Sequence, residues 1–330
     1  MKRHYYILLS LFIFCTITMG CRKEIGNVPE PCPSVYYWQT QLALDSTERA
    51  YLRQHEVGKM YVKFFDVALL DGRAMPVGTL QFRDSIPAGI KVIPTVFITE
   101  ECLHADTASL GEKIATRVKK MTDSEHVPNV SEVQIDCDWT PRSRDTYFAL
   151  LEDIRTRLKA FGWGMSVTIR LHQLQQAPPP ADYGVLMVYN TGNLKVRSDH
   201  NPILDMRDVE PFLKHLRNYD LPLCAAYPNY RWQLLFSGKD FKAILYDENL
   251  SDSTIYARIS GDTLYQVIQA RTLHGAMTAD YDIHIVPGQE VRVWECSEAD
   301  VKAIADKLEE VRPGINAQTI IYHLGAVSKK

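Results

Sequence analysis

The stretch Glu132-Val-Gln-Ile-Asp-Cys-Asp-Trp-Thr-Pro141 decides the fold class of this chain. Its first seven residues alternate between polar and apolar, which is typical of a β-strand. Successive side chains of a strand point to opposite faces, so Asp136 and Asp138 share one face while Ile135 and Cys137 share the other. Burying a carboxylate is costly unless it is paired or hydrogen-bonded. We therefore predict a buried strand with an acidic functional site at its C-terminal end. The alternative is an ion-pair network that only stabilises the strand ends.

Similar β-rich runs recur along the chain and alternate with segments of helical apolar spacing. The predicted strands are 35–39, 60–65, 92–99, 132–138, 165–171, 184–189, 222–227 and 319–324. The predicted helices are 46–55, 107–121, 143–161, 208–216 and 298–311. Eight strands alternating with helices over about 290 residues match a (β/α)8 TIM barrel, an α/β fold. A doubly wound open sheet is the second choice. The chain lacks a Gly-x-Gly-x-x-Gly or Walker-type loop, so nothing supports nucleotide binding.

Residues 232–295, between the seventh and eighth predicted strands, are too many for an ordinary connection. This segment contains strand-like runs of its own at 243–246, 254–259 and 291–294. We interpret it as a small α+β excursion within a single TIM-barrel domain of residues 34–330.

The N-terminus has the pattern of an exported lipoprotein. Lys2 and Arg3 precede an apolar run, 7–18, that is too short to cross a bilayer. The run ends in Thr18-Met19-Gly20-Cys21, which resembles a lipobox. We therefore expect a signal peptide at 1–20, lipidation (palmitate) of Cys21 and a proline-rich tether at 21–33. This organisation predicts a membrane-anchored protein of the cell envelope, in the outer membrane.

Composition excludes several other classes of protein. The net charge is −3 with no basic run, so we expect no nucleic-acid partner. Five cysteines follow Cys21, and their odd number and wide spacing exclude a full disulfide framework. The spacing of Asp136, Asp138 and His172 is not diagnostic of a metal site, and we expect neither a metal nor an organic cofactor.

Active residues of a TIM barrel come from the C-terminal ends of its strands and the loops that follow. The acids predicted there are Asp136 and Asp138, with Glu100 or Glu101 from the preceding strand. The predicted binding residues are Trp38, Asp66, Trp139, Arg170, His172, Asn190, Tyr227 and Trp232, with Tyr189 as a further catalytic candidate. Aromatic faces stack on sugar rings while carboxylates and amides bind hydroxyls, so this set predicts a glycan-binding cleft. An Arg170 guanidinium beside Asp136 is expected to lower the pKa of that acid.

Two short motifs resemble those of the family 18, chitinase-like glycoside hydrolases. Asp136-x-Asp138-Trp139 is similar to the core of that family's Asp-x-x-Asp-x-Asp-x-Glu signature. Met187-Val188-Tyr189-Asn190 is similar to its Met-x-Tyr-Asp/Asn motif on the sixth strand. The resemblance implies a TIM barrel in which Tyr189 steadies an intermediate formed by the substrate's N-acetyl group. A looser likeness is to bacterial barrel lipoproteins that carry an acid pair on this strand.

The sequence departs from the family at the catalytic position. Thr140 stands where the family has its catalytic Glu, and Val133-Gln134 replaces the leading Asp-Gly of the signature. Glycoside hydrolysis needs a carboxylic acid as proton donor, which Thr140 cannot be. Three functions therefore fit the sequence: a hydrolase with another donor, a non-catalytic glycan-binding lipoprotein on a former hydrolase scaffold, or an envelope structural protein.

Overall fold

The computed structural model describes residues 31–261, 263–274 and 282–329. The predicted signal peptide, Cys21 and most of the tether lie outside these residues. Within them, no helix has both the length and the apolar character needed to cross a membrane.

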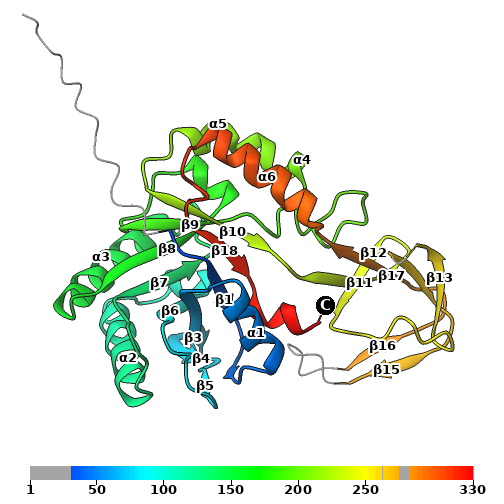
Figure 1. Ribbon diagram of the computed structural model, residues 1–330, viewed down its shortest axis with the longest axis horizontal. Helices are drawn as coiled ribbons and strands as arrows, with labels where there is room; N and C mark the ends of the chain where they lie inside the picture. The colour runs from blue at the N-terminus through cyan, green and yellow to red at the C-terminus, as the bar shows by residue number, and fades with distance from the viewer. Residues whose placement is uncertain (1–30, 262, 275–281, 330) are drawn as a thin grey trace, which may run out of the picture.

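Eight parallel strands close into a barrel, which confirms the predicted TIM-barrel fold (Figure 1). Each strand pairs with the next, and β1 closes the ring by pairing with both β18 and β3. The strands are β1 (Ser34–Tyr37), β3 (Lys59–Leu70), β6 (Lys91–Ile98), β7 (Glu132–Cys137), β8 (Gly164–Arg170), β9 (Tyr183–Met187), β10 (Leu223–Pro228) and β18 (Thr319–Tyr322).

The helices cover the outside of the barrel, but two of the connections are unusual. They are α1 (Ser46–Gln54), α2 (Leu110–Ser124), α3 (Arg144–Ala160), α4 (Met206–Val209), α5 (Leu213–Arg217) and α6 (Glu298–Val311), with 3-10 turns η1 (Glu100–His104), η2 (Leu171–Gln175), η3 (Glu210–Phe212) and η4 (Leu324–Lys329). The connection from β3 to β6 contains strands β4 (Arg73–Val77) and β5 (Gln81–Phe82) instead of a helix. Strand β5 pairs with β2 (Gln41–Leu42). The connection from β8 to β9 contains only η2. The predicted helix 208–216 is divided into three short pieces, with Pro211 in the middle piece.

Alternate strand residues separate an inner core from an outer one. The inner core is rich in aromatic residues, and Tyr36 and Tyr61 lie with ring centroids 5.0 Å apart. The outer core joins the strands to the helices and includes Ile135 and Cys137. The predicted period-two pattern of β7 is therefore present in the structure, because its odd residues face the helices.

A buried polar network crosses the lower end of the barrel, near the starts of the strands. Glu132 Oε1 accepts hydrogen bonds from Ser166 Oγ and Tyr183 Oη, each at 2.5 Å. The Tyr183 hydroxyl contacts the Tyr61 hydroxyl at 2.8 Å, which in turn accepts from Gln318. The network satisfies polar groups in the barrel interior that would otherwise be costly to bury.

The predicted excursion is a β-structure that extends to one side of the barrel (Figure 1). Strands β11 (Arg231–Ser237), β12 (Asp240–Leu245), β13 (Tyr256–Ser260), β14 (Leu264–Val267) and β17 (Glu290–Glu295) form one antiparallel sheet, and β15 (Arg271–Leu273) pairs with β16 (Ile283–Ile285). The insertion has an apolar core of its own. Its described residues contain no helix, which corrects the α+β expectation. Strands β11 and β12, β13 and β14, and β15 and β16 pair with their sequence neighbours, and β17 joins β11 to β14.

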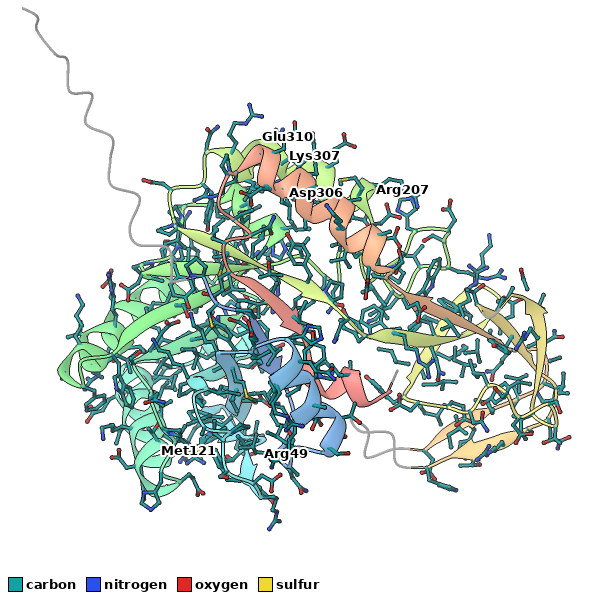
Figure 2. All side chains as sticks on the ribbon, in the orientation of Figure 1. Arg49, Met121, Arg207, Asp306, Lys307 and Glu310 are labelled. Atoms are coloured by element: carbon teal, nitrogen blue, oxygen red, sulfur yellow. The ribbon has the colours of Figure 1, made fainter. Side chains whose placement is uncertain are left out.

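Helix α6 begins with a capping box at Ser297 and connects the insertion to the last barrel strand, β18. Its outward face is charged, and Asp306, Lys307 and Glu310 point away from the barrel in Figure 2. Lys307 pairs with Glu310 at 2.8 Å on this surface. The opposite face of the helix carries the buried residues Ile304 and Leu308, so α6 is amphipathic.

Candidate functional site

Strand β7 places Asp136 inside the upper end of the barrel, where the side chain is almost fully buried at 2% exposure. Asp136 Oδ1 accepts hydrogen bonds from Thr168 Oγ1 at 2.5 Å and from Arg170 Nη2 at 3.0 Å. Burial raises the pKa of Asp136, although Arg170 and Thr168 oppose this effect. The predicted neighbour is therefore present, but the predicted direction of the pKa shift is wrong. The cost of desolvating the charge outweighs its attraction to one guanidinium.

Asp138 lies one strand repeat above Asp136 and is open to solvent, with 55% of its side chain exposed. Its Oδ1 lies 2.6 Å from Arg170 Nε, so both carboxyl groups bind the same guanidinium. Gln173 fixes this arrangement from behind. Its side chain accepts from Arg170 N at 2.8 Å and donates to Trp139 O at 3.0 Å. Gln173 is fully buried. Its two hydrogen bonds connect the residues just after β7 to the end of β8.

An open cavity of about 530 Å³ lies above these carboxyl groups at the barrel mouth. Its wall combines acids, aromatics and amides from six barrel strands and their loops: Trp38, Phe97, Asp136, Asp138, Arg170, Leu171, His172, Met187, Tyr189, Asn190, Thr191, Phe212 and Tyr322. We call this cavity the cleft. Seven of the predicted site residues line it, namely Trp38, Asp136, Asp138, Arg170, His172, Tyr189 and Asn190.

Tyr189 and Tyr322 form the aromatic wall of the cleft. Their rings are stacked, with centroids 4.5 Å apart and planes 17° from parallel. Tyr189 is only 7% exposed, and its buried hydroxyl has no hydrogen-bond partner among the described residues. Leaving a buried hydroxyl unpaired costs on the order of 1–3 kcal/mol. A ligand hydroxyl or carbonyl in the cleft would remove that cost.

Lys63 contacts a residue of the cleft wall, and His172 belongs to the wall itself. Lys63 Nζ lies 5.5 Å from the centroid of the Trp38 ring and also pairs with Asp66 at 3.0 Å. Asp66 is therefore linked to the cleft residue Trp38 only through Lys63 and does not line the cleft. Burial lowers the pKa of His172, while Asp138 opposes that shift. His172 is consequently neutral at pH 7 and available as a hydrogen-bonding partner.

Two predicted binding residues point away from the cleft. Trp139 is fully buried and its ring lies 6.1 Å from that of Tyr147 on α3. Tyr227 is also buried, and its hydroxyl donates to Asn316 at 2.7 Å. Both predictions are wrong for the same reason. Trp139 is two residues after Cys137, and Tyr227 is two residues after Ala225, which also packs in the outer core. Because side chains two residues apart share a face, the alternation that correctly placed Cys137 toward the helices also assigns Trp139 and Tyr227 to that side.

Glu100 does not reach the cleft wall either. It lies on η1, and Thr140 Oγ1 donates to its Oε1 at 3.1 Å. Hydrogen bonds, the strongest from Ser143, lower the pKa of Glu100 against a smaller effect of burial. Glu101 also lies on η1 and is outside the cleft lining. Glu100 is therefore a poor proton donor, and the predicted catalytic role loses its geometric basis.

The catalytic and binding residues predicted above leave out six residues of the cleft lining: Phe97, Leu171, Met187, Thr191, Phe212 and Tyr322. Phe97 follows the inward alternation of Ile93 and Thr95 on β6, so the strand period could have identified it. Tyr322 ends β18 at the mouth, as its position at a strand end allowed. Phe212 lies in η3 on a long connection, and no local pattern indicates that it returns to the mouth.

A second cavity, of about 470 Å³, lies beside the cleft between the barrel and the β-insertion. Asn190 and Tyr322 line both cavities. Trp232, a predicted binding residue, lines this second cavity and not the cleft. The insertion therefore forms a side wall and leaves the cleft open.

Solved structures that share this fold include two chitinases and a spore cortex-lytic enzyme. The chitinase of Chromobacterium violaceum ATCC 12472 matches with a TM-score of 0.53 and 14% identity, covering 90% of this chain and 95% of that one. The spore cortex-lytic enzyme SleL of Bacillus megaterium QM B1551 matches with a TM-score of 0.52 and 12% identity, covering 89% and 72%. Catalytic domain 2 of the Ostrinia furnacalis Group II chitinase matches with a TM-score of 0.50 and 9% identity, covering 89% and 90%.

These likenesses establish the class of fold. The chain shares the TIM-barrel fold of these structures. No protein-family model and no curated protein matches its sequence.

Proposed function

We propose that this protein is a glycan-binding lipoprotein of the cell envelope, anchored through Cys21, and that the cleft at the barrel mouth holds the sugar. The observation that carries the proposal is the Tyr189 hydroxyl, which is buried, unpaired among the described residues and set in a stacked aromatic wall. Polar groups in the cleft lining come from Asp138, His172 and Asn190. Aromatic faces with a few convergent polar groups are what a sugar ring requires.

The binding experiment uses a panel of soluble oligosaccharides, including N-acetylglucosamine oligomers and cello-oligosaccharides, with calorimetry as the readout. Tyr189→Phe removes only the hydroxyl, and we expect it to weaken binding by about fivefold to tenfold, the worth of one buried hydrogen bond. Tyr227→Phe is the matched control, because it removes a buried tyrosine hydroxyl that binds Asn316 outside the cleft. A Tyr189→Phe protein with unchanged affinity for every bound sugar would refute the assignment of the cleft.

Glycoside hydrolysis is the second candidate function, and one observation favours it. Asp138 is a half-exposed carboxyl group at the cleft wall, within reach of a bound sugar. A neighbouring acid of raised pKa, Asp136, lies on the same strand. Against hydrolysis, both groups bind one guanidinium on the same wall, whereas glycosidases place two carboxyl groups on either side of the scissile bond. We therefore rank binding above hydrolysis.

Reducing-end release during prolonged incubation separates the two functions. If the protein is a hydrolase, Asp138→Asn should abolish release while changing sugar affinity by less than threefold, because an amide cannot cycle a proton. If wild-type protein binds sugars but releases no reducing ends, the hydrolase candidate is excluded. Thr140→Glu should not create activity, because the new carboxylate would lie against that of Glu100.

A further inference from the structure

One part of the outer surface of the barrel lacks the helix that this fold normally places there. A (β/α)8 barrel has a helix after each strand. The connection from β3 to β6 contains only strands β4 and β5, so the outward side of β3 has no helix of its own. Helix α2, which belongs to the next connection, lies on the same side of the barrel (Figure 1). Its neighbouring helix position is therefore vacant.

A groove of about 660 Å³ lies between the β3–β4 hairpin and α2. We call it the outer groove. It is lined by Phe65 and Val67 of β3, by residues 74–76 of β4, and by α2, including Ile114. Met75 in this lining is 45% exposed. Large apolar side chains that stay exposed around a concave surface are typical of a site that binds another macromolecule.

The side of the outer groove formed by α2 is basic. Lys113, Arg117 and Lys120 are spaced by four and three residues, so they lie on one face of the helix. None of the three forms an ion pair within the described part of the chain. Glu112 is the one acid among the described lining residues, and it pairs with Arg157 on α3 at 3.5 Å. The outer groove therefore has an excess of positive charge, which attracts an acidic partner.

Arg117 is already held in position at the outer groove. Its guanidinium lies over the Phe65 ring, 5.2 Å from the centroid, and Nη2 donates to Thr79 Oγ1 at 3.0 Å. Its Nε is buried and has no hydrogen-bond partner among the described residues. Guanidinium groups form strong, directed hydrogen bonds to carboxylates. An arginine that is fixed in advance loses less entropy when such a bond forms.

The surroundings of the outer groove favour a helical partner over an extended one. Strand β4 is the edge strand of the barrel sheet, and an extended segment would have to pair with it. Pro76 in β4 has no backbone N–H, and proline on an edge strand disfavours the addition of another strand. An amphipathic helix instead places apolar side chains at helical spacing into an apolar groove. Acids beside its apolar stripe would face the basic side of α2.

We propose that the outer groove binds an acidic amphipathic helix of another protein. The apolar side chains of this helix contact the β3 and β4 residues of the groove, and its carboxylates pair with the three cations of α2. The outer groove and the cleft share no lining residue. The interaction therefore goes beyond the proposed glycan binding and does not depend on it.

The test is site-specific photo-cross-linking of the full-length protein in the cells that produce it, with p-benzoylphenylalanine in place of Met75. Mass spectrometry of the adduct identifies the cross-linked segment. We expect a segment of another protein with net negative charge and apolar residues at helical spacing. Val196 is the control position, because it is also exposed but does not line the outer groove. It should not give this adduct.

Charge reversal tests the role of α2. The double variant Lys113→Glu and Lys120→Glu should abolish the adduct at position 75, because like charges repel at an interface. The double variant Lys195→Glu and Lys239→Glu is the matched control, since it reverses two exposed lysines outside the outer groove and should leave the adduct unchanged. The cross-linked segment, made as a synthetic peptide, should bind the wild-type protein at least about tenfold more tightly than the first double variant. High salt should weaken this binding.

Each alternative result overturns the proposal in a different way. An adduct with lipid would show that the outer groove faces a membrane, and an adduct with the same chain would show self-association. A cross-linked segment that is basic, or that lacks apolar residues at helical spacing, would exclude the acidic helix. So would a peptide whose affinity is unchanged by the charge reversal, or the absence of any adduct specific to position 75. Glycan binding through Tyr189 would stand in all these cases, because the two sites are separate.

Discussion

Arg170 organises the chemistry of the cleft at the scale of single residues. It binds the buried Asp136 through Nη2 and the exposed Asp138 through Nε. A buried carboxylate that loses its partner is much more costly than an exposed one. Arg170 therefore offsets the free energy cost of placing the acidic face of β7 inside the barrel.

Arg170→Met should lower the free energy of unfolding by about 3 kcal/mol, because it leaves Asp136 buried and unpaired. The measurement is urea denaturation at pH 7. Asp136→Asn in the same chain should restore much of the loss, since the amide carries no charge. Arg144→Met is the control: Arg144 pairs with Asp145 on an exposed surface, and its loss should cost less than about 1 kcal/mol. Equal losses for the two arginine variants would contradict this account.

At the scale of elements, the β3–β4 hairpin takes the place of a barrel helix and positions residues behind the cleft. Asp66 on β3 pairs with Lys63, which faces the Trp38 ring. Gly78, just after β4, has φ of 54°, and a Cβ there would lie 2.6 Å from Asp66 Oδ2. The hairpin thus requires glycine at this point for both its backbone and the Asp66 carboxylate.

Gly78→Ala should destabilise the fold by about 2 kcal/mol or more, because it adds a clash to the cost of a left-handed backbone. Gly72→Ala is a matched control, since Gly72 has φ of 75° but nothing within 4 Å of its Cβ position. It should cost only about 1 kcal/mol. Denaturant titration gives both values. If the two variants are equally destabilised, the contact with Asp66 contributes nothing.

The network in the lower barrel makes stability depend on pH. Burial raises the pKa of Glu132 above its value in the unfolded chain. The folded state therefore keeps this proton at a pH where the unfolded state has released it. The contribution of Glu132 to the free energy of unfolding is complete below about pH 4 and is lost as the pH rises through the folded-state pKa.

Glu132→Gln should remove this dependence, because the amide oxygen can still accept from Ser166 and Tyr183. The variant and the wild type should be similarly stable near pH 4, and the variant should become the more stable of the two as the pH rises to 8. Thermal unfolding across this range measures the difference. Glu152→Gln, at an exposed site on α3, should show no such trend. A variant that loses stability relative to the wild type with rising pH would reverse the assigned sign.

At the scale of the whole molecule, the described residues contain no helix that could span a membrane. In our proposal, the lipid on Cys21 anchors the protein. Acyl chains provide membrane affinity in proportion to their buried methylene groups.

Cys21→Ala should move the protein from the membrane fraction to the soluble fraction and abolish labelling by a fatty-acid analogue. Fractionation and metabolic labelling are the measurements. Cys32→Ala is the control, because Cys32 is a free, partly exposed thiol close to the barrel and has no expected lipid. Labelling that survives Cys21→Ala would refute the lipobox interpretation.

The fold also explains why the two sequence motifs predicted the positions of some cleft residues but not the position of a proton donor. Asp136, Asp138 and Tyr189 lie in the cleft because strand order brings the ends of β7 and β9 to one mouth. Thr140 lies beyond the end of β7, and its hydroxyl contacts Glu100 rather than the cavity. A short motif specifies residues on one strand, whereas the position of a proton donor depends on the loop that follows.

The sequence by itself determined the approximate positions of the barrel strands, their order and the face of most strand residues, because these depend on local alternation and short-range backbone preferences. That same alternation placed Cys137 toward the helices and would have placed Trp139 and Tyr227 there too. Only the tertiary structure decided that burial raises the pKa of Asp136 despite Arg170, that Glu100 turns toward Thr140, and that Tyr322 joins two cavities. These features depend on contacts between segments far apart in the chain, whose combined desolvation and packing no local pattern encodes.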